Sequence, residues 1–275
     1  MHLLQKGYLR VSGLHSIYYE LRGKKDGVPA VFLHGGPGSR FKPKHFKNFP
    51  PNHQVLFFDQ RGCGRSRPFG ELKENKTKEL VEDIAKLMDH LGFKKAKIVG
   101  GSWGYTLAMC FAIKYPHRVK KLVIGGIYLG TKEEAIEMMR IFRLFSPKLY
   151  EESKRTPSFF KKLDSSMVQR LHMLEYSIMR NEKTWNDIRL GKVKKSDWIE
   201  IHYIRNDCFM PPDYIMKNLY KIKHIPTVII QGQQDLVCPP ISAWNISKIF
   251  KKKKLIIVPG GHSLSNAHQL FRKYI

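Results

Sequence analysis

Short apolar segments recur along the chain, and most are apolar throughout rather than alternating with polar residues. They span residues 17–21, 30–34, 55–58, 97–101, 122–126, 227–232 and 255–260. Strands buried on both faces of a mostly parallel sheet have this continuous pattern. We therefore predict a central, mostly parallel sheet built from these segments.

Helical patterns lie between the predicted strands, most clearly over residues 77–92. There the apolar residues recur at helical spacing: Leu80, Val81, Ile84, Leu87, Met88 and Leu91. We expect Thr77 to cap the start of this helix and Gly92 to end it. Strands that alternate with helices predict an α/β fold.

The pattern changes between about residues 131 and 222. Thr131 and Glu134 form a plausible capping box, and helices and polar loops follow without a strong strand pattern. The strand pattern resumes at "IPTVII". We predict an α/β core over residues 1–130 and 223–275, with an inserted helical cap, or lid, over residues 131–222.

Composition narrows the class of protein. The chain of 275 residues is 42% hydrophobic and 26% charged, as is ordinary for a globular protein. No apolar run is long enough to span a bilayer, and the N-terminus lacks a signal-peptide pattern, so we predict a cytoplasmic location. The four cysteines form no CxxC pair, so neither a metal site nor a disulfide framework is indicated.

The formal net charge of +26 raises nucleic acid as a possible partner. The lysines are spread over the whole chain, however, and no basic tail accompanies them. We expect at most nonspecific binding of nucleic acid through the basic surface. A basic nucleic-acid-binding protein is kept as a remote alternative.

One serine, Ser102, stands between glycines in the stretch "IVGGSWGYT". Gly100 to Gly104 fit the pattern G-x-S-x-G, with a predicted strand before it and an apolar, helix-like segment after it. This is the context of a nucleophile elbow, in which a sharp turn holds the serine at a helix N-terminus. We predict that Ser102 is a nucleophile.

A serine hydroxyl needs a base, and in this fold the order along the chain is serine, acid, histidine. Asp235 follows the predicted strand at 227–232, and His262 follows the strand at 255–260. We predict His262 as the general base and Asp235 as the residue that orients it. The alternative for Asp235 is an ordinary turn aspartate.

The segment "HGGPG" at residues 34–38 follows a predicted buried strand and exposes glycine amides. Such a loop supplies oxyanion-hole donors in esterases. We predict the amide of Gly36 as one donor and that of Trp103 as the other. A simple turn is the alternative.

Several motifs together resemble the bacterial proline iminopeptidases (prolyl aminopeptidases), serine peptidases of the α/β-hydrolase superfamily. These are "VFLHGGPG", "FFDQRGCGRSRP", "GGSWGYTLA", "GQQDLVCPP" and "VPGGHS". The resemblance implies an α/β-hydrolase fold and removal of an N-terminal proline from peptides, without a metal or other cofactor. It also implies that the catalytic triad is Ser102, Asp235 and His262.

The resemblance further implies substrate-binding residues. Glu200 takes the place of a family glutamate that binds the free α-ammonium, and Glu175 resembles a second such glutamate. Tyr128 takes the place of an aromatic residue near the proline ring. The alternatives are a surface glutamate paired with a lysine for Glu200 and a core residue for Tyr128. At the level of the whole protein, the alternative is a cap-bearing esterase or amidase with a different small substrate.

Overall fold

The computed structural model describes residues 1–156, 158–179, 186, 189, 197–264 and 267–275. Eight strands form one sheet in the order β1-β2-β4-β3-β5-β6-β7-β8. Only the β1–β2 and β2–β4 pairs are antiparallel. The strands are β1 (Leu3–Arg10), β2 (Ser16–Gly23), β3 (Val28–Leu33), β4 (His53–Phe58), β5 (Ala96–Gly101), β6 (Val119–Gly125), β7 (Thr227–Gly232) and β8 (Lys253–Val258). The predicted mostly parallel sheet is confirmed.

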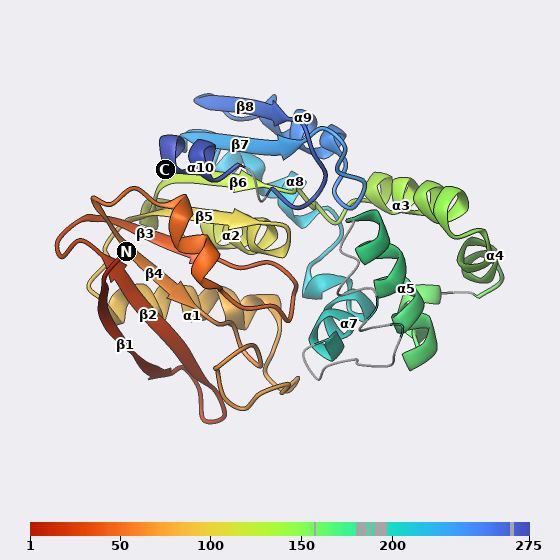
Figure 1. Ribbon diagram of the computed structural model, residues 1–275, viewed down its shortest axis with the longest axis horizontal. Helices are drawn as coiled ribbons and strands as arrows, with labels where there is room; N and C mark the ends of the chain where they lie inside the picture. The colour runs from red at the N-terminus through yellow and green to blue at the C-terminus, as the bar shows by residue number, and fades with distance from the viewer. Residues whose placement is uncertain (157, 180–185, 187–188, 190–196, 265–266) are drawn as a thin grey trace.

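Helices follow or join these strands (Figure 1). The α-helices described are α1 (Thr77–His90), α2 (Trp103–Lys114), α3 (Lys132–Phe145), α4 (Pro147–Arg155), α5 (Ser165–Ile178), α7 (Asp197–Arg205), α8 (Tyr214–Asn218), α9 (Pro240–Ser247) and α10 (His268–Tyr274). Short 3-10 helices are η1 (Pro43–Asn48), η2 (Pro116–Arg118), η3 (Phe159–Lys162), η4 (Asp207–Phe209) and η5 (Leu219–Lys221). Within the described ranges, no helix has the length and apolar character needed to cross a bilayer.

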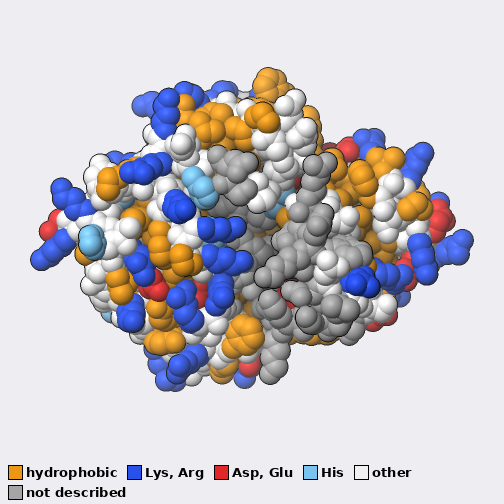
Figure 2. Space-filling view, viewed as in Figure 1, with side chains coloured by type: hydrophobic (Ala, Val, Ile, Leu, Met, Phe, Trp, Pro, Cys, Tyr) orange, Lys and Arg blue, Asp and Glu red, His pale blue; other side chains and the backbone are white. Residues whose placement is uncertain are grey.

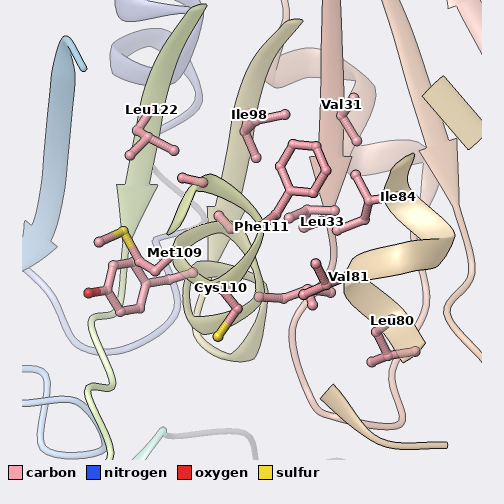
Figure 3. Packing of buried hydrophobic residues seen from close by; sticks show 14 of the residues in the cluster. Val31, Leu33, Leu80, Val81, Ile84, Ile98, Met109, Cys110, Phe111 and Leu122 are labelled. Atoms are coloured by element: carbon pink, nitrogen blue, oxygen red, sulfur yellow. The ribbon is translucent and has the colours of Figure 1, made fainter. Parts of the chain in front are cut away.

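Alternate residues of the central strands feed two separate apolar clusters. Val31 and Leu33 of β3 and Ile98 of β5 join one cluster with side chains of α1 and α2, including Ile84 and Phe111 (Figure 3). Their strand neighbours, such as Phe32 and Val99, join a second cluster that includes Phe271 of α10. Both faces of the sheet are therefore covered, which explains why these strands are apolar throughout.

The two ends of α1 differ from one another in how they match the sequence prediction. Gly92 follows the helix with a left-handed φ of 70°, as expected of a residue that ends a helix. Thr77, however, does not cap the start: Lys76 is the N-cap residue, and the Thr77 hydroxyl donates a hydrogen bond to the carbonyl of Cys208. The Thr77 hydroxyl, which was predicted to cap the helix, therefore makes a tertiary contact instead.

Between residues 131 and 222, every regular element that the structure describes is a helix. The capping box at the start of α3 is present, with Thr131 and Glu134 as its two members. Figure 1 shows α3, α4, α5 and α7 grouped beyond the end of the sheet toward which β6 and β7 point. Phe142, Leu163 and Ile201 belong to an apolar cluster formed within this segment. The helical segment therefore stands over the carboxyl ends of the parallel strands.

A buried ion pair fixes the loop that follows β4 to helix α1. Arg61 donates two hydrogen bonds to the carboxylate of Asp83, at 2.6 and 2.7 Å, and both side chains are almost fully buried. Removing one partner leaves the other charge buried without compensation. We expect Asp83→Ala to lower the free energy of unfolding by about 3–5 kcal/mol, measured by urea denaturation.

The matched control for this change is Asp89→Ala. Asp89 lies on the same helix and pairs with Arg118 at 2.7 Å, but its side chain is 65% exposed. An exposed ion pair contributes about 1 kcal/mol or less. Equal losses in the two variants would contradict the role assigned to the Arg61–Asp83 pair.

Candidate active site

Ser102 lies at the sharp turn between β5 and α2. Its backbone φ of 56° and ψ of −131° are rare for a residue with a side chain. The flanking glycines make the turn possible, because a Cβ on Gly100 would overlap the carbonyl oxygen of Gly104, and a Cβ on Gly104 would overlap that of Leu33. The predicted elbow is therefore present, and both glycines of its pattern lie where backbone atoms leave no room for a side chain.

His262 and Asp235 meet beyond the ends of β8 and β7. The imidazole Nδ1 lies 2.9 Å from one carboxylate oxygen of Asp235 and 3.1 Å from the other. The buried carboxylate also accepts hydrogen bonds from the amides of Val237 and Cys238. Burial opposes the charged imidazole, but contact with Cys238 and the Asp235 carboxylate raises the pKa of His262 well above its ordinary value. Asp235 thus holds the ring by Nδ1 and favours the imidazolium.

Ser102 and His262 both line a cavity of about 260 Å³. Gly126 lies between them: a Cβ there would be 3.1 Å from both His262 Cε1 and the Ser102 amide nitrogen. Gly35, from the loop after β3, also lines this cavity. The three residues predicted as a triad therefore come from three strand ends and converge on one edge of the sheet.

The two predicted oxyanion donors belong to the loop after β3 and to the residue that directly follows Ser102. Gly36 has a left-handed φ of 116°, which favours glycine, and Trp103 is the first residue of α2. Within the described part of the chain, neither amide donates a hydrogen bond to another residue. A Cβ on the preceding Gly35 would lie 3.9 Å from Ser102 Oγ. The loop therefore approaches the serine, and the two donor roles stay predictions.

A buried hydrogen-bond network ties the loop after β3 to the elbow. The amide of Gln60 donates to His34 Nε2 at 3.0 Å, so His34 Nδ1 carries the proton and donates to the Gly35 carbonyl at 2.9 Å. The Gln60 side chain donates to the His34 carbonyl and accepts from the indole of Trp103 at 2.8 Å. Sequence reasoning missed this network, because "HGGPG" predicted only backbone donors and "DQRG" served only as part of the family resemblance.

Glu175 of α5 and Glu200 of α7 lie close together above the strand ends. Glu200 faces His172, with 3.2 Å between its carboxylate and His172 Nε2. Although burial opposes it, contact with Glu200 raises the pKa of His172 to about 9. Burial and the neighbouring Glu200 raise the pKa of Glu175 to about 7, while His172 and His262 oppose this rise. Among the described residues, the ion-pair partner of Glu200 is thus this imidazole and not the lysine of the alternative.

Tyr128 lies between β6 and α3 and is partly buried against the apolar cluster that the sheet forms with α1 and α2. Its carbonyl accepts a hydrogen bond from the Thr106 hydroxyl at 3.0 Å. Its predicted place beside the substrate stays a prediction. Among the described residues, no group of three His, Cys, Asp or Glu side chains is arranged to hold a metal ion.

The comparisons with known proteins agree with this geometry. The sequence matches the alpha/beta hydrolase fold family over residues 29–265. Proline iminopeptidase of Neisseria meningitidis is 37% identical over 280 residues, covering 93% of this chain and 89% of the relative. Proline iminopeptidase of Arabidopsis thaliana is 36% identical over 287 residues, covering 94% and 74%. The solved structure of a proline iminopeptidase-related protein from Thermus thermophilus has a TM-score of 0.70 at 18% identity, covering 99% of this chain and 97% of that one.

The sheet order, the elbow and the family match show that the protein is an α/β hydrolase. Sequence identity above 30% over nearly the whole chain then narrows the class. The chain belongs to the proline iminopeptidase family. The resemblance drawn from its motifs is therefore confirmed.

Proposed function

We propose that the protein is a serine aminopeptidase that releases N-terminal proline from peptides through an acyl-enzyme intermediate. The observation that carries the proposal is one cavity lined by Ser102 and His262, with Asp235 hydrogen-bonded behind the imidazole. The proline iminopeptidases among the relatives support the choice of substrate.

The geometry supports the following sequence of steps. Ser102 Oγ attacks the carbonyl carbon of the first residue while His262 Nε2 takes the hydroxyl proton. The oxyanion is stabilised by the amides of Gly36 and Trp103. The imidazolium then gives its proton to the leaving amine, which breaks the peptide bond and leaves an ester on Ser102. Water, deprotonated by His262, attacks this ester. The imidazolium returns its proton to Ser102 Oγ, and free proline is released.

The cap, residues 131–222 over a core of 1–130 and 223–275, is proposed to select the free amine. Glu175 and Glu200 place two carboxylates near each other, with the buried His172 imidazole of α5 paired to Glu200 of α7. A carboxylate that is partly desolvated gains from a cation, and a substrate ammonium supplies one. Its arrival favours loss of the proton from Glu175. Tyr128 is proposed to contact the proline ring.

The amine requirement gives the test of this function. We expect the protein to hydrolyse prolyl anilide far faster than N-acetylprolyl anilide, because acylation removes the ammonium. We also expect Glu200→Gln to lower kcat/KM for prolyl anilide about 10- to 100-fold, as for loss of a hydrogen bond to a charged group. Turnover is measured for both anilides and for a short-chain acetate ester.

The matched control is Glu137→Gln, a half-exposed glutamate of α3 whose partner is Arg140. It is expected to change neither activity. If Glu200→Gln lowered ester hydrolysis as much as anilide hydrolysis, Glu200 would act on structure rather than on the amine. If the ester were the better substrate and acylation made no difference, the alternative of a cap-bearing esterase or amidase would replace the proposal.

Two further expectations from the sequence stay predictions. One is a cytoplasmic location, and the other is nonspecific binding of nucleic acid through the basic surface. Neither changes the chemistry proposed for Ser102.

A further inference from the structure

The cavity beside Ser102 carries fixed positive charges on one wall. Arg40, Lys42 and Lys44, from the loop after β3 and from η1, all line it. Among the described residues that line this cavity, no aspartate or glutamate occurs. Figure 2 shows Lys and Arg side chains gathered on the face where η1 lies. A ligand group that enters from this side therefore meets a positive potential.

The imidazoles of the same wall do not change this picture at neutral pH. Burial lowers the pKa of His34, and burial together with Lys44 lowers that of His45 to about 3. The His34 and His45 rings are therefore neutral, and the permanent cations of this wall are the guanidinium of Arg40 and the ammonium groups of Lys42 and Lys44. These three residues are exposed, so water and salt reach them.

The acidic groups of the site lie elsewhere, on the cap. Glu175 and Glu200 belong to α5 and α7, and the His262 imidazole is close enough to influence Glu175. His262 also lines the cavity with the basic wall. His262 is thus close enough to the cap carboxylates to influence Glu175, and it lines the same cavity as the cations of the loop after β3 and of η1.

We propose that Arg40, Lys42 and Lys44 form a carboxylate subsite for the residue that follows the scissile bond. This inference rests on the proposed aminopeptidase function and specifies its substrate class. The carboxylate is either the free C-terminus of a dipeptide or an acidic side chain at that residue. A zwitterionic dipeptide has an ammonium at one end and a carboxylate at the other. The cap carboxylates and the basic wall therefore favour a single direction of the dipeptide over Ser102.

The test compares prolylglycine, prolylglycinamide, prolylglutamyl amide and prolyl anilide at low salt. We expect kcat/KM for prolylglycine to exceed that for prolylglycinamide about tenfold, as two or three exposed charge pairs allow. Higher salt is expected to shrink this ratio. If the acidic side chain is the group bound, kcat/KM for prolylglutamyl amide instead exceeds that for prolylglycinamide. This comparison distinguishes the two sources of the carboxylate.

The double variant Arg40→Gln/Lys44→Gln is expected to remove the preference for the carboxylate and to leave prolyl anilide turnover unchanged. The matched control is Lys47→Gln, an exposed lysine on the same helix that lines a different cavity. It should keep the preference. Equal turnover of prolylglycine, prolylglycinamide and prolylglutamyl amide by the unmodified protein, or a preference that survives the double variant, would overturn the subsite while anilide turnover upholds the proposed function. Loss of anilide turnover in the unmodified protein would overturn both.

Discussion

Replacing Ser102 by alanine is expected to lower kcat for prolyl anilide by about 10⁵- to 10⁶-fold, the scale seen when a triad serine is removed. The reason is chemical: without Oγ no ester forms, and the imidazole held by Asp235 has no hydroxyl to deprotonate. The change is measured by steady-state kinetics on highly purified protein, with thermal unfolding as the check of the fold.

Two features make this variant a clean test. Ser102 holds a left-handed φ as serine, and alanine places the same Cβ there, so the turn keeps its strain and its shape. The matched control is Ser247→Ala, whose hydroxyl donates to the Trp244 carbonyl on α9, away from the cavity. Its activity should equal that of the unmodified protein. Activity of Ser102→Ala within tenfold of normal, in protein of normal stability, would remove Ser102 from the mechanism.

The features that sequence predicted well are those that local physics decides. Strands buried on both faces must be apolar throughout, so the segments that became β3 to β7 could be recognised one by one. The elbow could be recognised because its pattern requires glycine at positions 100 and 104. Backbone atoms lie so close to both residues that a side chain there would overlap them. Chain order then selected Asp235 and His262.

The features that sequence missed depend on distant partners. β1 (Leu3–Arg10) is an edge strand, mostly exposed, and its residues carry no continuous apolar signal. Its structure comes from pairing with β2. His172 meets Glu200 across two helices, and Gln60 links two loops to Trp103. No spacing within one segment encodes such contacts. Much of the cap between residues 180 and 196 also lies outside the described residues.

Replacing Asp235 by asparagine is expected to lower kcat for prolyl anilide about 10⁴-fold, a loss typical of a misoriented triad histidine. Oδ1 accepts the amides of Val237 and Cys238, at 3.0 and 2.8 Å, and these bonds require an oxygen at that position. The new NH₂ group therefore replaces Oδ2, which lies 2.9 Å from His262 Nδ1, and the hydrogen bond that Gln231 Nε2 donates to Oδ2 at 3.1 Å is lost. A donor there forces Nδ1 to accept, so the ring proton moves to Nε2.

A ring protonated at Nε2 cannot take the proton of Ser102, and the imidazolium also loses the carboxylate that stabilised it. The expected signature is therefore a fall in kcat with little change in KM, since Asp235 is buried behind His262 and away from the substrate. Asp213→Asn, on an exposed residue that precedes α8, is the matched control and should leave both constants unchanged. A loss in Asp235→Asn of less than tenfold would mean that another acceptor orients His262, because a wrong tautomer alone suffices to block proton transfer.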